Sequence, residues 1–222
     1  DDKKPASVDD DSTGGLGTDE GGDRQVTVVV EPDREAVQEA QMEIQQKIKD
    51  GEINQTEAQR EFAAVQQDLL AEAVTETKTT IADVGATTEL INLEDYELPS
   101  LNAVDEDVPD AQTLRKTVEQ ADSVLLGTPN YHGSYSGALK NALDYCGRDE
   151  FEGKTVGLLE VAAGDFPGSA LIHLRTISRT LRAWTLPTEV AIPNSSSVVD
   201  ENRITDPKIA DRTHQLGRNL AL

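Results

Sequence analysis

The densest group of chemically distinctive residues in this chain is one short run: Thr128-Pro129-Asn130-Tyr131-His132-Gly133-Ser134. Pro129 fixes its own φ angle and has no N–H group, so it can set the direction in which the neighbouring N–H groups point. Tyr131 offers a flat apolar face, and Gly133 permits close approach or a positive φ angle. These residue types suit a loop that presents backbone N–H groups to a planar ligand. The alternative is a tight turn capped by Ser134, with no ligand.

A second run has similar character: Ala162-Ala163-Gly164-Asp165-Phe166-Pro167-Gly168. Gly164 and Gly168 give the backbone freedom to turn, and the N–H groups near Gly164 and Asp165 are candidates for ligand binding. The alternative here is a Gly-Pro-Gly spacer that contacts no ligand.

The remaining reactive side chains do not assemble into a catalytic pattern. No His, Cys and Asp cluster has the spacing of metal ligands, and Ser195-Ser196-Ser197 lacks a paired base and is interpreted as a loop. His173 and His214 fall within helical patterns and are expected to be structural or exposed. The single Cys146 excludes an internal disulfide, as expected of a reducing compartment, so we expect the cytoplasm.

Strand patterns precede both runs. Residues 123–127 (SVLLG) and 155–161 (TVGLLEV) are almost continuously apolar, which is typical of strands buried on both faces of a parallel sheet. Helical patterns alternate with strands, which indicates βαβ units, and ligands of such sheets bind beyond the carboxyl ends of the strands. The predicted strands from residue 87 onward are 87–93, 123–127, 155–161 and 189–192, and the predicted helices are 110–120, 136–145, 169–184 and 206–219.

The N-terminal part has a different organisation. Residues 25–30 (QVTVVV) are β-branched and predict a first strand, which brings the sheet to five strands. Two helical patterns follow, at residues 33–49 and from Asn54 or Thr56 to Asp83, with a break at Asp50-Gly51. They carry too few large apolar residues to form a core alone, so they must pack on the α/β domain or on a partner.

The charge of the chain excludes some partners. Forty-two acidic residues against twenty basic ones give a formal charge of −22, which repels nucleic acid and anionic membranes. No stretch has the apolar length of a membrane span. The acids are spread along the whole chain and Lys is scarce, which indicates a halophilic surface adapted to concentrated salt. An ordinary acidic protein with an acidic tail is the alternative.

Residues 127–145 (GTPNYHGSYSGALKNALDY) resemble the signature of the NADPH-dependent FMN reductase family. Members carry Thr-Pro-x-Tyr-(Asn/His)-x-Ser followed by Gly-x-Leu-Lys-Asn, and the strand and loop order on both sides also agrees. The resemblance covers residues 86–222 and implies a flavodoxin-like three-layer sandwich. It also implies FMN held without a covalent bond, electrons from NADH or NADPH, and a flavin, quinone, azo compound or metal ion as acceptor.

The resemblance assigns roles to the two runs. It places Thr128, Pro129, Asn130, Tyr131, His132, Gly133 and Ser134 at the flavin ring, with Ala163, Gly164 and Asp165 at its pyrimidine end. Hydride transfer through flavin N5 needs no protein base, so no catalytic side chain is expected and His132 is interpreted as a ring or rim contact. The carboxylate of Asp165 should disfavour an anionic reduced ring. The family also suggests a homodimer or a dimer of dimers.

The resemblance does not extend to the phosphate loop of the family, which has Gly-Ser-x-Arg directly after the first strand. Here Glu31-Pro32-Asp33-Arg34 follows Val30. Three interpretations remain open: the phosphate is bound weakly or elsewhere, with Arg34 as the cation; a loop at 54–56 with Arg60 replaces the lost site; or the protein no longer binds FMN and acts as a structural or interaction subunit.

The expected organisation is therefore a disordered acidic tail at residues 1–24, a first strand with an atypical helical hairpin at 25–85, and a flavodoxin-like flavin-binding domain at 86–222. The tail has almost no large apolar side chain to offset the entropy cost of ordering.

We predict that salt stabilises this protein and its self-association. Removing the ions that screen the carboxylates leaves their repulsion uncompensated, so the melting temperature should fall between molar and low salt. Calorimetry gives the melting temperature, and light scattering across the same series should show dimers or larger species that dissociate at low salt. A melting temperature indifferent to salt contradicts the adaptation, and a monomer throughout contradicts the association.

Overall fold

The computed structural model describes residues 24–30, 44, 46–50, 54–101, 108–200 and 203–222. Its centre is a parallel five-stranded sheet, as predicted, and the strand order is β2-β1-β3-β4-β5. The strands are β1 (Gln25–Val30), β2 (Thr87–Asn92), β3 (Ser123–Pro129), β4 (Thr155–Val161) and β5 (Trp184–Ile192).

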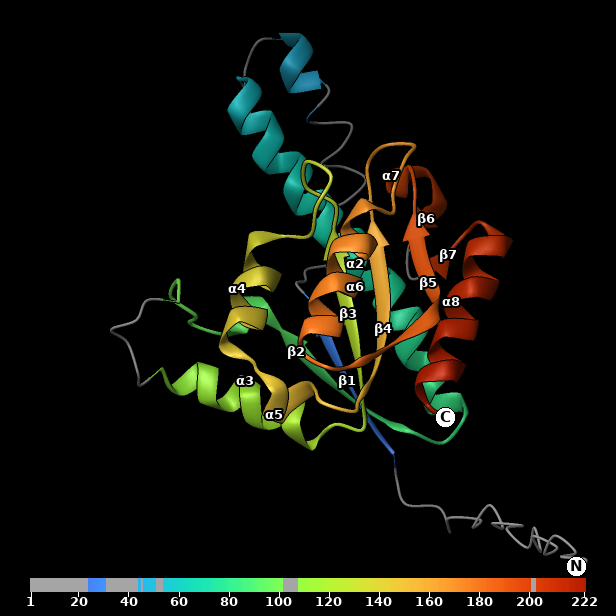
Figure 1. Ribbon diagram of the computed structural model, residues 1–222. Helices are drawn as coiled ribbons and strands as arrows, with labels where there is room; N and C mark the ends of the chain where they lie inside the picture. The colour runs from blue at the N-terminus through green and yellow to red at the C-terminus, as the bar shows by residue number, and fades with distance from the viewer. Residues whose placement is uncertain (1–23, 31–43, 45, 51–53, 102–107, 201–202) are drawn as a thin grey trace, which may run out of the picture.

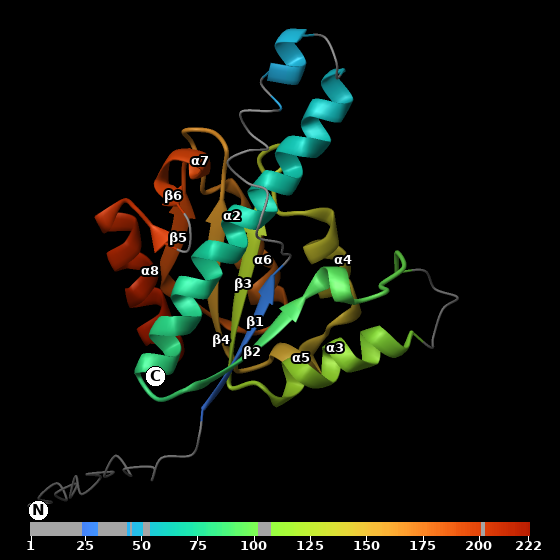
Figure 2. The same cartoon turned by 180° about the vertical axis from the view of Figure 1, so that it is seen from behind.

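The longer helices form two layers, one on each face of the sheet (Figure 1). Helices α2 and α8 cover one face, and the turned view in Figure 2 shows both in front of the strands. Helices α3, α4 and α6 cover the other face. The five longer helices are α2 (Gln55–Asp83), α3 (Pro109–Gln120), α4 (Gly137–Tyr145), α6 (Ser169–Thr180) and α8 (Pro207–Leu220).

Short elements complete the chain: η1 (Leu93–Asp95), α5 (Arg148–Phe151), α7 (Ser195–Val198) and the antiparallel pair β6 (Val199–Asp200) and β7 (Arg203–Ile204). The short helix α7 corrects the interpretation of residues 195–197 as a loop.

The alternation of side chains across the strands builds two cores. Val28, Leu125 and Leu159 belong to the core beneath α2 and α8, whereas Val124 and Leu158 belong to the core beneath α3, α4 and α6. Every residue of β3 is buried, which explains its continuous apolar run.

The predicted boundary between α6 and β5 was wrong, and β3 runs to Pro129 instead of ending at 127. The helix expected at 169–184 ends at Thr180, and β5 begins at Trp184 instead of 189. Arg182 adopts a left-handed φ of 65° between them, a conformation that ends the helix and turns the chain into the strand. The apolar spacing continues across this turn, so the sequence pattern did not reveal it.

Strand β1 lies between β2 and β3, and α2 connects it to β2. Residues 25–30 and 55–83, expected to be an atypical segment, therefore contribute a strand and a covering helix to the same sheet. Of the helix predicted at 33–49, residues 44 and 46–49 are helical, and the remainder lies outside the described residues, as do residues 1–23 of the predicted tail.

Helix α2 is longer than the sheet requires. Its 29 residues span about 44 Å, whereas a six-residue strand spans about 20 Å. The N-terminal part of α2 consequently extends past the carboxyl ends of the strands (Figure 1).

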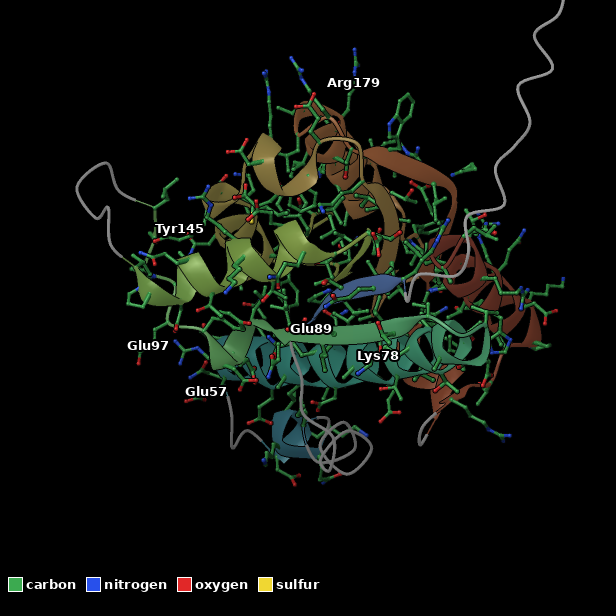
Figure 3. All side chains as sticks on the ribbon, turned by 90° about the horizontal axis from the view of Figure 1, so that it is seen from below. Glu57, Lys78, Glu89, Glu97, Tyr145 and Arg179 are labelled. Carbon is green, nitrogen blue, oxygen red and sulfur yellow. The ribbon has the colours of Figure 1, made fainter. Side chains whose placement is uncertain are left out.

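The outer surface carries the charges that the composition predicts. Viewed from below the sheet, the labelled side chains of Glu57, Glu97 and Arg179 lie toward the edges of the molecule, and that of Glu89 lies near the middle of the view (Figure 3). All four residues are exposed.

We predict that Gly217→Val destabilises the protein, because α8 and α2 touch at this residue. A Cβ atom there would lie 3.0 Å from Cβ of Thr80 and 3.1 Å from the carbonyl oxygen of Thr77, which is backbone of α2. Overpacking of this kind costs about 1–3 kcal/mol, and thermal or urea unfolding measures it. Gln215→Val places the same side chain on the exposed face of α8 and should change stability far less. Equal effects of the two substitutions would contradict this contact.

Candidate functional site

A cavity of about 650 Å³ opens at the carboxyl edge of the sheet. Two loops form most of its lining, residues 130–133 after β3 and residues 162–166 after β4, together with Ser169. The overhanging part of α2 supplies a third wall through Gln59, Ala63 and Gln66. This volume lies in the range of sites for small molecules and cofactors.

The structure brings most of the sequence-predicted site residues to this cavity. Those that line it are Asn130, Tyr131, His132, Gly133, Ala163, Gly164 and Asp165. The structure thus joins the two runs, which are separated by about thirty residues along the chain.

The other three predicted residues lie behind the lining. Thr128 is fully buried, and its hydroxyl group accepts a hydrogen bond from the N–H of Ser136 at 3.0 Å. Pro129 is the buried last residue of β3. The Ser134 hydroxyl lies 3.0 Å from Nδ1 of His173. In this structure all three support the shape of the loop.

The loop after β3 is a tight turn. Tyr131 and Ser134 exchange two backbone hydrogen bonds, at 2.8 and 3.1 Å. Between them His132 and Gly133 both have positive φ angles, 53° and 78°, which is the geometry of a type I′ turn. Gly133 is therefore required for its backbone conformation, and the side chain of His132 is exposed at the rim.

Backbone donors around the cavity are available for a ligand. Among the described residues, the N–H groups of His132, Ala163, Gly164 and Asp165 have no acceptor. N–H groups normally find a partner in the chain, in water or in a ligand. Both loops therefore present unused donors.

Tyr131 joins the loop to α2. Its hydroxyl group donates to the carbonyl oxygen of Ala63 at 3.1 Å, across sixty-eight residues of sequence. The half-buried ring consequently stands between the loop and the helix and lines the cavity. The sequence suggested the apolar face of this ring but not the contact with α2.

Asp165 is held by the start of α7, a segment to which the sequence analysis gave no role in the site. Its carboxylate accepts a hydrogen bond from Nδ2 of Asn194 at 2.6 Å. The backbone of the same segment binds the carbonyl groups of Gly164 and Ala162, through Asn194 N–H at 3.1 Å and Ser195 N–H at 3.0 Å. Asn194 has a φ of 44°, a conformation that Asn tolerates better than most residues.

Glu160 is a further residue that the sequence analysis missed. It is fully buried at the end of β4 and accepts hydrogen bonds from Asn130, Gly168 and Leu171. The only signal in the sequence is an acidic residue within the apolar run TVGLLEV.

The described lining contains no Lys or Arg, and its acidic residue is Asp165. Arg60 is exposed on α2 and is not part of the lining, and Arg34 lies outside the described residues. At the start of α2, Asn54 Oδ1 accepts from Thr56 N–H at 2.9 Å and Glu57 N–H at 3.1 Å. These donors are thus used within the chain, which argues against a phosphate site at residues 54–56.

Other reactive groups lie away from the cavity. Burial raises the pKa of Cys146 to about 12, so this thiol stays protonated and weakly nucleophilic at neutral pH. His214 pairs with Glu76 at 2.9 Å. Within the described residues there is no cluster of potential metal ligands, nor any helix long and apolar enough to cross a bilayer.

The sheet order defines a flavodoxin-like α/β protein, and its cavity lies at the carboxyl edge, where ligands of such sheets bind. The sequence model of the NADPH-dependent FMN reductase family matches residues 62–197, and the chain belongs to this family. The match begins inside α2 and includes both loops of the cavity.

Individual relatives agree with this assignment. The chain is 41% identical over 104 residues to an FMN-dependent NADPH-azoreductase of Staphylococcus aureus (strain USA300). The aligned segment covers 47% of this chain and 54% of the relative. The chain thus aligns with about half the length of the curated relatives it matches.

Solved structures share the fold. FerB, a flavoenzyme NAD(P)H:(acceptor) oxidoreductase from Paracoccus denitrificans, has a TM-score of 0.62 and 18% identity, with 89% of this chain and 95% of that chain covered. An oxidoreductase from Corynebacterium diphtheriae has a TM-score of 0.60 and 14% identity, with coverage of 89% and 94%.

Proposed function

We propose that this protein is an NAD(P)H-dependent reductase of flavins or quinones that uses bound FMN. The observation that supports the proposal is the cavity between residues 130–133 and 162–166, which is lined by Tyr131 and by residues whose backbone N–H groups have no acceptor in the described chain. The S. aureus relatives are named as azoreductases, so azo compounds are acceptors of interest as well.

The cavity fits the ring of FMN in size and in its donors. A flavin ring presents carbonyl oxygens and ring nitrogens along one edge, which match the N–H groups of His132, Ala163 and Gly164. Tyr131 supplies an apolar face, and α2 shields the cavity from water on a third side. For the phosphate, the described lining offers no cation.

FMN, when bound, supplies the acceptor and donor of hydride through its N5 atom. The residues of the chain would bind FMN and orient its ring. Its loop N–H groups would hold the ring edge. Tyr131 and Ala63 fix the distance between the loop and α2, and Asn194 holds the Asp165 carboxylate in the rim. That carboxylate disfavours extra negative charge on a reduced ring. No side chain of the cavity is assigned as an acid or base.

The alternative is a flavodoxin-like subunit that has lost FMN and serves a structural or interaction role. Two observations favour this alternative, because neither suits a phosphate. Asp165 makes the rim of the cavity acidic, and the first N–H groups of α2 are already hydrogen-bonded to Asn54.

We further propose a cytoplasmic, salt-adapted protein that forms homodimers or dimers of dimers. The support is the formal charge of −22, the reducing environment indicated by the single Cys146, and exposed apolar side chains near the cavity. Phe166 is 93% and Ile172 66% exposed, and contact between copies would remove them from water.

We predict that protein purified in molar salt binds flavin and oxidises NADH or NADPH when FMN and a quinone are supplied. The unused donors and the tyrosine face should hold the ring and place N5 within reach of the nicotinamide. Visible absorbance after gel filtration measures bound flavin, and loss of absorbance at 340 nm measures turnover. A colourless protein that binds no added flavin would support the structural alternative.

We also predict that riboflavin binds almost as well as FMN. The phosphate gains little where the described lining has no cation and the local carboxylates oppose it. Calorimetric titration with both ligands in the same buffer compares the two dissociation constants. A strong preference for FMN would reveal a phosphate site that the described residues do not contain.

A further inference from the structure

Glu160 is a buried carboxylate with no part in the proposed hydride transfer. It has no exposed surface, and burying a carboxylate is unfavourable unless hydrogen bonds replace its water. Three N–H donors do so: Nδ2 of Asn130, the backbone N–H of Gly168 at 3.0 Å and that of Leu171 at 3.3 Å. All three carry no formal charge, so this is a hydrogen-bonded carboxylate and not half of an ion pair.

Two of these donors belong to the two loops that flank the cavity, and the third, the N–H of Leu171, lies in the first turn of α6. Asn130 begins the loop after β3, and its Oδ1 in turn accepts from the N–H of Gly133 at 2.9 Å. Glu160 therefore acts, through Asn130, on the turn at His132 and Gly133. Gly168 closes the loop after β4. A single carboxylate thus ties the two walls together.

The contact with α6 has a second consequence. The N-cap of α6 is Gly168, which has a φ of 119° and no side chain to cap the helix. Glu160 from the preceding strand takes that role and satisfies two N–H groups at the helix start, where negative charge is favourable. The end of the 162–168 loop is thereby anchored to the strand from which it departs.

We propose that Glu160 is a positioning residue of the ligand site. Its carboxylate sets the separation of the two loops and, through Asn130, the direction of the unused N–H groups around the turn. The ligand part of this inference rests on the proposed flavin site, but the loop-positioning part does not.

The test is Glu160→Gln, which keeps the size of the side chain but turns one acceptor into an NH₂ donor facing N–H groups. In the ligand-free protein, we expect faster hydrogen exchange at the hydrogen-bonded amides of residues 130, 131, 133, 134, 168 and 171. Riboflavin, titrated by flavin absorbance and calorimetry, should bind about tenfold or more weakly. The absorption band of bound riboflavin should also move toward that of the free molecule.

Glu150→Gln is the matched control. Glu150 is also buried, accepts from Gly147 N–H at 2.6 Å at the start of α5, and pairs with Arg115 at 2.7 Å. It lies outside the cavity lining. We expect it to lower the melting temperature while leaving exchange in both loops and riboflavin affinity within about twofold of wild type.

The outcomes separate the two proposals. If wild type binds riboflavin and Glu160→Gln binds it equally well with unchanged loop exchange, Glu160 only stabilises the fold and the inference is overturned. If wild type binds no flavin, the proposed function fails, and the exchange rates alone decide whether Glu160 positions the loops.

A second variant applies if Glu160→Gln does not fold. Asn130→Ala leaves the hydrogen bonds of Glu160 to Gly168 and Leu171 in place. It removes the bonds that the Asn130 side chain donates to Glu160 and to Ser169 Oγ and accepts from Gly133 N–H. Exchange should then rise at residues 131–134 and stay unchanged at 168–171, with weaker riboflavin binding. Unchanged exchange at 131–134 would overturn the inference.

Discussion

The site depends on the hydrogen-bond register between β3 and β4. Thr128 pairs with Glu160 and Pro129 with Val161, so both strands end at the same level. The next residues, Asn130 and Ala162, therefore leave the sheet side by side, and Asn130 N–H donates to the carbonyl oxygen of Val161 at 2.7 Å. Because side chains alternate in direction along a strand, Glu160 lies on the same face as Thr128 and Asn130. A one-residue slip would turn Glu160 into the opposite core and separate it from Asn130 and α6.

Helix α2 links the packing of the core to the shape of the cavity. Its C-terminal part packs on α8 at a contact so close that Gly217 is needed. Its N-terminal part extends past the sheet, and Ala63 accepts the hydrogen bond from Tyr131. Since one rigid helix makes both contacts, the third wall of the cavity is positioned by the core beneath α2 and α8 and not by the loops alone.

Charge shapes the site as strongly as packing does. Acidic residues occupy positions where an anion-binding protein would leave N–H groups free. Glu57 accepts from Asn54 N–H at 2.8 Å at the start of α2, and Glu160 accepts at the start of α6. Helix N-termini attract anions, and at the starts of α2 and α6 a carboxylate of the chain itself takes the place that a bound anion would occupy. The ring-binding part of the cavity uses neutral donors and is compatible with this arrangement.

The sequence by itself determined the sheet and the two loops of the site. Buried parallel strands are almost wholly apolar, and Gly, Pro and Tyr at strand ends have local conformational meaning, so β1, β3, β4 and the runs after β3 and β4 could be predicted from composition and order. Local patterns also placed α2, which begins at the expected Asn54 cap. The boundary between α6 and β5 could not be predicted, because Arg182 turns the chain without a Gly or Pro.

Only the tertiary structure decided how the site is assembled. Tyr131 meets α2, Asn194 meets Asp165, and Glu160 meets both loops. Each contact joins segments whose separation depends on strand register and helix length, and no spacing along the chain encodes such distances. From the sequence alone, an acidic residue in an apolar run is compatible with an exposed position of the strand, with a segment that is not a strand, or with a buried carboxylate that accepts hydrogen bonds. Only the neighbours that the fold brings to Glu160 distinguish these, because the burial of a carboxylate is tolerated where donors surround it.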